Sequence, residues 1–344
     1  MIGISVVVTV KNDEEGVRLL LENLKKQTVR PDEVIIVRSE DYGNCTRGRG
    51  RNIGVRMAKN EFIAVTDVGC RPRRDWVEKI TAGLNTPKES SFASWSASTP
   101  AKSDPSGFGR TSEFFQGKNT GLSEKVVVAG WYEAVAETPW QKAFLPYLVP
   151  RGFNKGRALK VQGQAFQTFL PASRSIAFTK SAWELVGGYP EEPVSGGEDL
   201  KFADKLCNHP GIKIIYSPKA VVDWPVPATL TEFIKDMVKH TKGNFEAGYW
   251  PHIVRNLSVV ARWMAMVVWP WVIPGYLIFA GLNKGQAFEY KGLALQAKVI
   301  KNIKIIMIIL LVRLIADAAV VYGTVIGIID GWVIKKLRLR ASDG

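Results

Sequence analysis

The sequence is poor in cysteine and contains no internal repeat or low-complexity tract. Its three cysteines, Cys45, Cys70 and Cys207, form no CxxC pair. This spacing fits neither a zinc motif nor a disulfide framework, and it predicts a reducing compartment. A signal peptide is not expected, because residues 4–10 already have the pattern of a β-strand.

Acidic residues are also in short supply: 32 oppose 46 lysines and arginines, which leaves a net charge of +14. Such an excess favours an anionic partner. Nucleic acid, acidic lipid headgroups and phosphorylated substrates all meet this requirement. The motifs below favour the last two, so we predict no nucleic-acid partner.

Two apolar segments near the C-terminus have almost no charge. Residues 263–282 contain none, and residues 305–329 are interrupted by Arg313 and Asp317. Because roughly 20 apolar residues cross a bilayer as a helix, we predict two membrane spans. Arg313 and Asp317 are four residues apart and should pair on one helical face. Two core helices of a soluble protein are the alternative.

The N-terminal region alternates between strand and helix patterns. Apolar runs at 4–8, 33–37 and 62–66 predict strands, and the segments between them predict helices. This β-α-β-α-β order predicts a Rossmann-like wound, mostly parallel sheet. A GxGxxG loop is absent, which disfavours a dinucleotide enzyme. Further strands are predicted at 173–179 and 212–216.

The chain divides into three predicted regions. Residues 1–228 form a catalytic domain, residues 229–262 form amphipathic helices in the membrane interface, and residues 263–344 form the transmembrane region. Residues 86–128 suit either strands and loops crossing the sheet or an insertion. Residues 139–171 mix aromatic and basic side chains, which suits either an acceptor groove or a solvated loop on the membrane surface.

Asp67 follows the strand at 62–66 and is followed in turn by Gly69 and Cys70. Ligands of open α/β sheets bind beyond the carboxyl ends of the strands. A carboxylate there can hold a divalent metal against a diphosphate. The alternative is that Asp67 only stabilises a turn.

Four segments together resemble family-2 inverting glycosyltransferases with a GT-A fold, of the small, membrane-anchored, cellulose-synthase-like type. The resemblance covers about residues 4–248 and lies in SVVVTVKNDEE, RGRNIGVRMAKNEFIAVTDVGC, SRSIAFTKSAWELVGGYPEE and GGEDLKFADKL. It implies that Asp67 is the first residue of the family's Asp-x-Asp motif, which holds Mg²⁺ or Mn²⁺ on the donor diphosphate. Gly69 stands where the second Asp is expected, and one carboxylate can suffice when phosphates and water complete the coordination shell.

The resemblance also places the family's catalytic Glu-Asp at Glu198 and Asp199. Inverting transfer needs a carboxylate that takes the proton of the acceptor hydroxyl. Asp199 is the predicted base, with a pKa lowered by the helix N-terminus. Glu198 has a structural alternative, because Ser195 and Glu198 have the spacing of a capping box.

The remaining site residues are transferred from the family by position. The predicted donor-binding residues are Thr9, Asn12 and Asp13 in the first loop, Asp41 (with Glu40 as its alternative), Arg51, Asn52, Lys239 and His240. Arg51 could reach the diphosphate or lie on the surface. Lys239 and His240 occupy the nearest, poor match to the family's Gln-x-x-Arg-Trp motif.

These observations predict a membrane-bound enzyme that transfers one sugar, with a lean to mannose from GDP-mannose, onto a lipid-linked acceptor for glycan assembly. Its partners would be a nucleotide-diphosphate sugar, the lipid-linked acceptor and an anionic membrane surface. A processive polysaccharide synthase and a non-catalytic nucleotide-sugar or lipid-binding scaffold are the alternatives.

The predicted location is the cell membrane, with the catalytic domain and both chain ends in the cytoplasm. Basic residues around the predicted spans favour a two-span hairpin with residues 283–304 outside. The lysines of that connection support an alternative, in which it lies on the cytoplasmic surface. In that case the first segment re-enters without crossing, or a third short segment brings the chain back.

Overall fold

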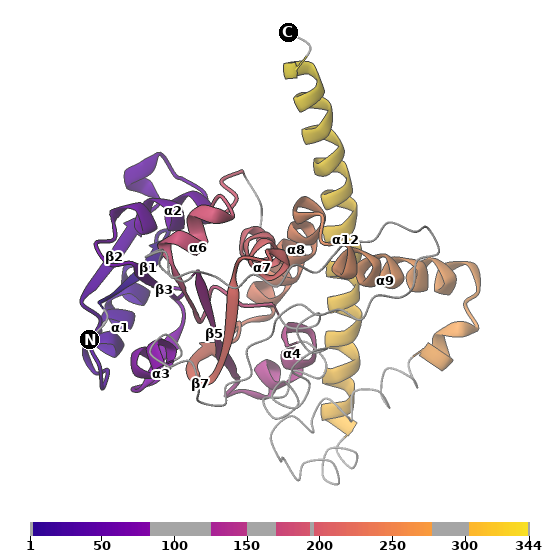
Figure 1. The fold of residues 1–344 in the computed structure, drawn as a ribbon. Coiled ribbons are helices and arrows are strands. Elements are labelled where there is room, and N and C mark those ends of the chain that lie inside the picture. Colours follow the sequence, from indigo (N-terminus) through magenta and orange to yellow (C-terminus); the bar gives the residue numbers. More distant parts are fainter. Residues whose placement is uncertain (1–2, 83–124, 150–169, 193–195, 277–302, 343–344) are drawn as a thin grey trace, which may run out of the picture.

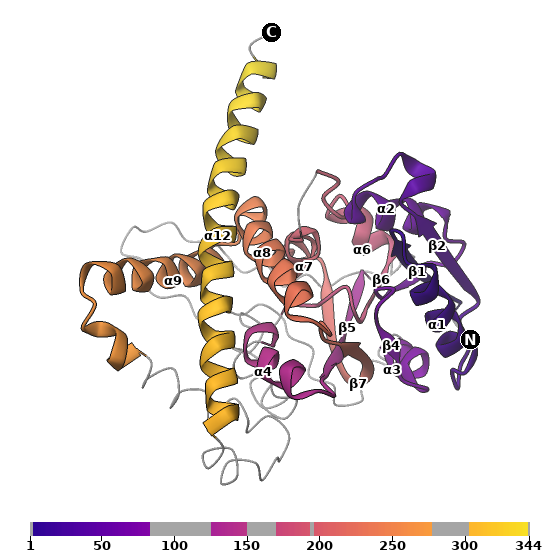
Figure 2. The same cartoon turned by 180° about the vertical axis from the view of Figure 1, so that it is seen from behind.

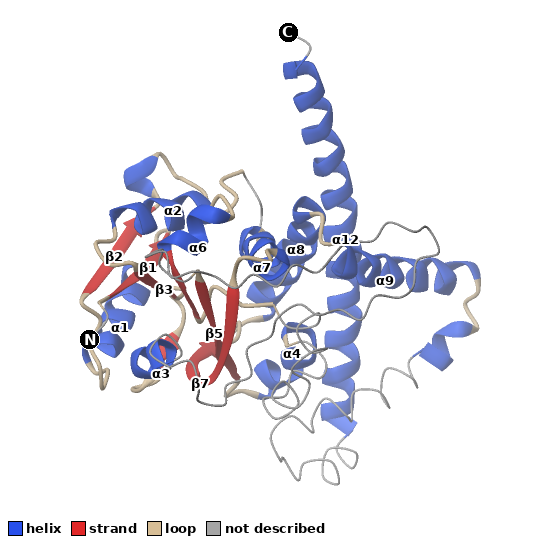
Figure 3. Cartoon of the chain, in the orientation of Figure 1, coloured by secondary structure: helices blue, strands red, loops and turns tan. Residues whose placement is uncertain are grey.

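The computed structural model describes residues 3–82, 125–149, 170–192, 196–276 and 303–342. In them a seven-stranded sheet has the order β2-β1-β3-β6-β5-β7-β4 and carries helices on both faces (Figures 1 and 3). An α/β architecture is therefore confirmed.

The N-terminal half has the predicted β-α-β-α-β order. Its elements are β1 (Ile4–Val10), α1 (Glu14–Lys25), β2 (Glu33–Arg38), a 3₁₀ turn η1 (Glu40–Tyr42), α2 (Arg47–Met57) and β3 (Phe62–Val65). β1 pairs in parallel with both β2 and β3, so the carboxyl ends of all three strands meet at one edge. The strand residues are mostly buried, as expected for a sheet covered on both faces.

The other half of the sheet is mixed in direction. Its strands are β4 (Arg71–Pro72), β5 (Val126–Val135), β6 (Ile176–Thr179) and β7 (Lys213–Pro225). β6 runs antiparallel to both β3 and β5, whereas β5 and β7 are parallel. β7 is longer than the predicted strand at 212–216. Ser217, Pro218 and Lys219 interrupt its apolar pattern, yet the pairing with β5 continues beyond a register shift at Ala129–Trp131.

Two apolar cores lie on the two faces of the sheet. α1 and α3 (Trp76–Ala82) cover one face, where the buried indole of Trp76 donates a hydrogen bond to Ser175 Oγ at 2.9 Å. α2, α6 (Lys180–Leu185) and α7 (Glu198–Asn208) cover the other face. There Tyr189 and Phe202 stack with ring centres 3.8 Å apart. The aromatic packing anchors α7 against the sheet.

Part of the ambiguous segment 139–171 is a helix, α4 (Pro139–Leu148), which excludes the alternative of a solvated loop there. Thr138 and Gln141 form a capping box that starts the helix. Phe144 is buried and stacks on Phe233 at 4.3 Å between ring centres. Residues 150–169 lie outside the described residues, as do residues 86–124 of the other ambiguous segment.

The predicted amphipathic region consists of α8 (Leu230–Ala247) and α9 (Trp250–Val268). Gly248 separates them with a φ of 66°, a left-handed conformation that glycine adopts at helix ends. Phe233 of α8 is fully buried in a cluster with Phe144, Val312 and Ala316. At Phe233, this face of α8 therefore packs against α4 and α12.

The C-terminal helix α12 (Ile303–Ser342) runs alongside α8, and α9 projects away from the sheet domain (Figures 1 and 2). An added Cβ at Gly323 would lie 2.9 Å from the Val238 carbonyl oxygen, and one at Gly327 would lie 3.1 Å from Phe245 Cβ. The two glycines, four residues apart, let the helix backbones approach closely, as small residues do in membrane helix pairs.

Among the described residues, one helical segment, Leu310–Gly331, is long and apolar enough to cross a membrane. Two spans are therefore not supported. The described part of the predicted first span, 263–276, is not one helix, because α9 ends at Val268 just before Pro270. Proline lacks the backbone donor of a helix interior and disfavours helical geometry in the preceding residue. Residues 277–302 lie outside the described residues.

The predicted pair within the second span is confirmed. Arg313 Nε lies 3.0 Å from Asp317 Oδ2, and both side chains are buried. The hydroxyl of Tyr276 accepts a hydrogen bond from Arg313 Nε at 2.8 Å and donates to Asp317. Arg313 and Asp317 thus neutralise each other's charge, and Tyr276 forms a hydrogen bond to each of them, among the apolar side chains of packed helices.

Candidate active site

Arg51 on α2 joins the end of β3 to the start of α7. Its side chain is 2% exposed, and it donates hydrogen bonds to Asp67 Oδ1 at 2.9 Å and to Glu198 Oε1 at 3.0 Å. Its guanidinium lies 5.2 Å from the ring centre of Tyr189. Burial alone would lower the pKa of Arg51, but the charges of Asp67 and Glu198 raise it. Arg51 is therefore a permanent buried cation and not the surface arginine of the alternative hypothesis.

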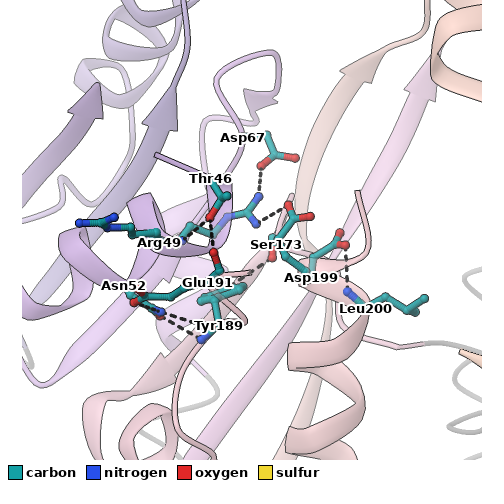
Figure 4. Close-up of polar contacts among 11 residues, drawn as sticks. Thr46, Arg49, Asn52, Asp67, Ser173, Tyr189, Glu191, Asp199 and Leu200 are labelled. Atoms are coloured by element: carbon teal, nitrogen blue, oxygen red, sulfur yellow. Dashed lines mark hydrogen bonds and ion pairs between the residues drawn. The ribbon is translucent and has the colours of Figure 1, made fainter. Parts of the chain in front are cut away.

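Asp67 occupies the edge at which β1 and β3 end, and its carboxylate is 34% exposed. The turn after β3 is closed by a backbone bond from the Cys70 N–H to the Asp67 carbonyl, 2.9 Å. The side chain itself bonds to Arg51 (Figure 4). Burial would raise the pKa of Asp67, but Arg51 and then Arg174 hold it below its usual value. Asp67 is thus an ionised, accessible carboxylate.

Glu198 is buried at the first position of α7, and the predicted capping box is wrong. The helix is preceded by Gly197, which provides no side-chain cap. Gly197 is needed because an added Cβ would lie 2.5 Å from the Gly243 carbonyl oxygen of α8. Glu198 therefore stands too early in the helix to close a capping box, and it bonds to Arg51 instead. Its other oxygen, Oε2, has no hydrogen-bond partner among the described residues.

Asp199 adjoins Glu198 and is partly buried. Its Oδ1 accepts a hydrogen bond from the Leu200 N–H at 2.9 Å (Figure 4). Burial, followed by the negative charge of Glu198, raises the pKa of Asp199 to about 6, although Arg51 and Arg174 oppose the rise. The expected lowering by the helix N-terminus is therefore outweighed by burial. A carboxylate with this pKa is a stronger proton acceptor than an ordinary aspartate.

We expect Asp199→Asn to stabilise the protein at pH 7.5 and to give little gain near pH 4. The folded-state pKa of about 6 exceeds the ordinary 3.8. Ionisation of Asp199 therefore lowers stability as pH rises between these values, and the whole cost is present above pH 6. Asparagine is neutral throughout. Melting temperatures of both proteins across this range test the prediction, with Asp204→Asn on the same helix as the control. A pH-independent difference would contradict it.

Asn52 holds the loop before α7. Its amide oxygen accepts hydrogen bonds from Trp183 Nε1 and the Tyr189 N–H, both at 2.9 Å. Its amide nitrogen donates to the Tyr189 carbonyl and to Glu191 Oε1, both at 2.8 Å. These four hydrogen bonds use every donor and acceptor position of an asparagine side chain. The hydrogen-bonding positions of Asn52 are thus all used by groups of the protein, whereas the resemblance predicted that Asn52 binds the donor.

The predicted first-loop residues lie at the end of β1. Asn12 adopts a left-handed conformation, with φ of 52°, and its N–H bonds to Glu40 Oε1 at 3.1 Å. Asp13 caps α1 by accepting from the Gly16 N–H at 2.9 Å. Thr9 precedes this loop, and Asp41 lies with Glu40 in η1 after β2. The loops after β1 and β2 therefore meet, and Glu40, the weaker of the two alternatives, makes the contact.

Lys239 and His240 on α8 lie beside the loop that leads into α7. An added Cβ at Gly196 would lie 3.5 Å from Lys239 Cε and 3.9 Å from His240 Nδ1. Burial and the charge of Arg47 lower the pKa of Lys239, while carboxylates that include Glu198 and Asp67 oppose this. The structure therefore brings these two residues to the same site as Asp67 and Asp199.

Arg174, just before β6, also lies in this arrangement, although no sequence motif indicated it. Its guanidinium lies 4.1 Å from the ring centre of Trp224 and 5.0 Å from that of Tyr132. Its charge acts on the pKa values of both Asp67 and Asp199. Its surroundings come from β5 and β7, far away in sequence, so no local signal marked it.

Few side chains of the site could coordinate a metal ion. Among the described residues, no group of three or more His, Cys, Asp or Glu side chains could hold an ion. Asp67 nevertheless presents a carboxylate that is 34% exposed, and an added Cβ at Gly69 would meet no atom within 4 Å. The residues fit Mg²⁺ or Mn²⁺ only when most ligands come from a phosphate substrate and water.

Comparisons with known proteins give a fold but no family. No protein-family model and no curated protein sequence matches the chain. The solved mannosyltransferase PcManGT from Pyrobaculum calidifontis, in complex with GDP-Man and Mn²⁺, has a TM-score of 0.50 and 16% identity. The match covers 95% of this chain and 87% of that one. This chain accordingly has a glycosyltransferase fold.

TarS of S. aureus is a more distant match. Its 1–349 fragment in complex with UDP-GlcNAc has a TM-score of 0.41 and 16% identity, with coverage of 70% of this chain and 66% of that one. A longer TarS structure has a TM-score of 0.39 and 17% identity, and the match spans 39% of its length.

Proposed function

We propose that the protein is an inverting, GT-A-type glycosyltransferase that moves one sugar from a nucleotide-diphosphate donor to a lipid-linked acceptor. The observation that supports this most is the buried Arg51 bridge. It connects Asp67 at the carboxyl end of β3 with Glu198, and thereby places Asp199 at the same edge of the sheet. A metal-facing carboxylate and a base with a raised pKa are the two groups that such a transfer requires.

In the proposed reaction, Asp199 takes the proton of the acceptor hydroxyl. The hydroxyl oxygen forms a bond to the anomeric carbon while the bond from that carbon to the donor phosphate breaks. The electron pair of that bond remains on the leaving diphosphate. Attack from the face opposite the leaving group inverts the anomeric centre. Because Asp199 accepts a proton only when ionised, activity should rise with pH through about 6.

Asp67 would hold Mg²⁺ or Mn²⁺ through one carboxylate oxygen, and donor phosphates would supply further ligands. When bound, the ion would neutralise negative charge on the diphosphate. Thr9, Asn12, Asp13 and Asp41 would surround the nucleotide, and Lys239 and His240 would face the phosphates. Arg51 would fix Asp67 in place. GDP-mannose is the favoured donor, in line with the ligand of the structurally similar PcManGT.

We expect Asp67→Ala to abolish metal-dependent binding of nucleoside diphosphate while the protein remains folded, since Arg51 keeps Glu198 as a partner. Calorimetric titration with GDP or UDP, with and without Mn²⁺, measures this. Asp32→Ala is a control at a distance, because that side chain bonds to the Ile4 N–H at the opposite end of β1. Unchanged binding in Asp67→Ala with Mn²⁺ would leave Asp67 as a structural residue only.

The proposal that the acceptor is lipid-linked rests on a groove between α8 and α12. Ile234, Val238, Lys235, Lys239, Lys242 and Tyr322 line it. Its surface is almost entirely apolar and includes the stems of three lysines, which suits a hydrocarbon chain. We propose that residues 1–228 are the catalytic domain on the cytoplasmic side of the cell membrane. Residues 229–262 would lie at the membrane surface, and residues 263–344 would anchor the chain.

A transfer assay tests the whole proposal. The purified protein in detergent receives GDP-mannose or a UDP-sugar, a long-chain lipid phosphate and Mn²⁺ or Mg²⁺. We expect a product one hexose heavier than the acceptor. A ladder of products would support the processive synthase instead. Binding of the donor without any turnover would support the scaffold.

A further inference from the structure

Hydrogen bonds of its neighbours and of its own backbone hold Arg174 in place, although it lies outside any helix or strand. The serines on both sides of it are buried: Ser173 Oγ bonds to the Tyr189 hydroxyl at 3.2 Å, and Ser175 Oγ donates to the Ala220 carbonyl at 3.0 Å. The Arg174 carbonyl accepts from Thr66 Oγ1 at 2.8 Å. Arg174 is thereby tied to Thr66, the residue immediately before Asp67.

The side chain is also held, but by rings and not by an acid. Its guanidinium lies against Trp224 and Tyr132, at 4.1 and 5.0 Å from the ring centres. Among the described residues, no carboxylate forms an ion pair with it. Arg51 differs, because two carboxylates occupy its guanidinium. Aromatic faces orient a guanidinium while leaving its N–H groups available to an anion.

The charge of Arg174 lowers the pKa of Asp67, so this cation lies near the carboxylate that would face the metal. Asp67 is the single carboxylate at the end of β3, and one of its oxygens is engaged by Arg51. Gly69 offers no side chain there. A metal ion held by a single carboxylate of the protein would leave part of the donor's negative charge unneutralised. An arginine matches two phosphate oxygens at once and can neutralise that part.

On the basis of the proposed function, we propose that Arg174 binds the diphosphate of the donor and stabilises the charge of the leaving nucleoside diphosphate. As the bond from the anomeric carbon to the phosphate oxygen breaks, its electron pair adds negative charge to that oxygen. The acceptor proton passes to Asp199, so the guanidinium and the base act at opposite ends of the displacement. Arg174 keeps its own protons throughout.

The test compares nucleoside diphosphate with nucleoside monophosphate. The probes are GDP and GMP, or UDP and UMP if these bind better, titrated with Mn²⁺ present. We expect Arg174→Met to weaken diphosphate binding by roughly tenfold to a hundredfold, the worth of hydrogen bonds to a charged group. Monophosphate binding should change by less than about threefold by the same reasoning. The turnover number with saturating donor should fall by about a hundredfold or more.

Arg56→Met is the matched control, because Arg56 also lies over an indole, 5.7 Å from the ring centre of Trp183, but is 56% exposed. It should keep the diphosphate preference. Arg174→Gln, neutral but polar, replaces Arg174→Met if that variant does not fold, and the same loss is expected. Equal weakening of both nucleotides, or full diphosphate affinity in a folded variant, overturns the assignment. Failure of the wild type to bind any nucleoside diphosphate overturns the proposed function itself.

Discussion

Asp199→Asn should lower the rate of sugar transfer by at least about a hundredfold, the usual worth of general base catalysis. The amide keeps the size of the side chain, and its oxygen can still accept from the Leu200 N–H, but it cannot take up the proton. Donor affinity should hardly change. Single-turnover transfer and calorimetric donor binding separate the two effects.

The neighbouring Glu198→Gln is the matched comparison. Its amide oxygen can still accept from Arg51, and Glu198 Oε2 makes no hydrogen bond among the described residues that would be lost. We therefore expect a smaller loss of activity than in Asp199→Asn. Should Glu198→Gln prove the less active variant, the base assignment is wrong.

Arg51→Met should lower the free energy of unfolding by about 3–5 kcal/mol, the cost of leaving a buried ion pair without one partner. Methionine fills a similar length but leaves the buried carboxylate of Glu198 and the half-buried one of Asp67 uncompensated. The loss should shrink as the pH falls, because protonation removes the unpaired charge. Urea unfolding in detergent at pH 5 and pH 7.5, followed by tryptophan fluorescence, measures both effects.

Arg38→Met is the control for this substitution. Arg38 also binds a carboxylate, Glu14 at 2.8 Å, but the two side chains are 41% and 65% exposed. Surface pairs contribute little to stability, so unfolding should be almost unchanged. An equally small effect for Arg51→Met would show that Arg51 is not the structural centre of the site.

The fold could be predicted where the sequence has a local hydrophobic pattern. Apolar runs and helical periods predicted every strand and α-helix from β1 to β3. Asp67 was proposed because it follows β3, and Arg51 because of its position in the resemblance. β5 was not predicted as a separate strand, because its first residues, 126–128, lie in the ambiguous segment 86–128. Arg174 was not predicted as a site residue, because its Tyr132 and Trp224 neighbours come from strands that are distant in the sequence.

Other features had sequence patterns with two physical solutions. The apolar stripe of α8 suits a membrane surface and a protein core equally, and at Phe233 it packs on Phe144. At α7, Ser195 and Glu198 have capping-box spacing, but the close contact of Gly197 with α8 sets the start of the helix. The pKa of Asp199 depends on that same tertiary burial, so the helix dipole alone gave the wrong direction.

The close approach of α8 and α12 fixes the position of α12 relative to the candidate active site. One side of α8 carries Lys239 beside Gly196, and its other side touches the backbone of α12 at Gly323 and Gly327. Gly323 and Gly327 belong to the apolar segment Leu310–Gly331, so this segment lies directly against the helix that carries Lys239. The position of the apolar segment and the position of Lys239 at the candidate site are therefore coupled through one helix.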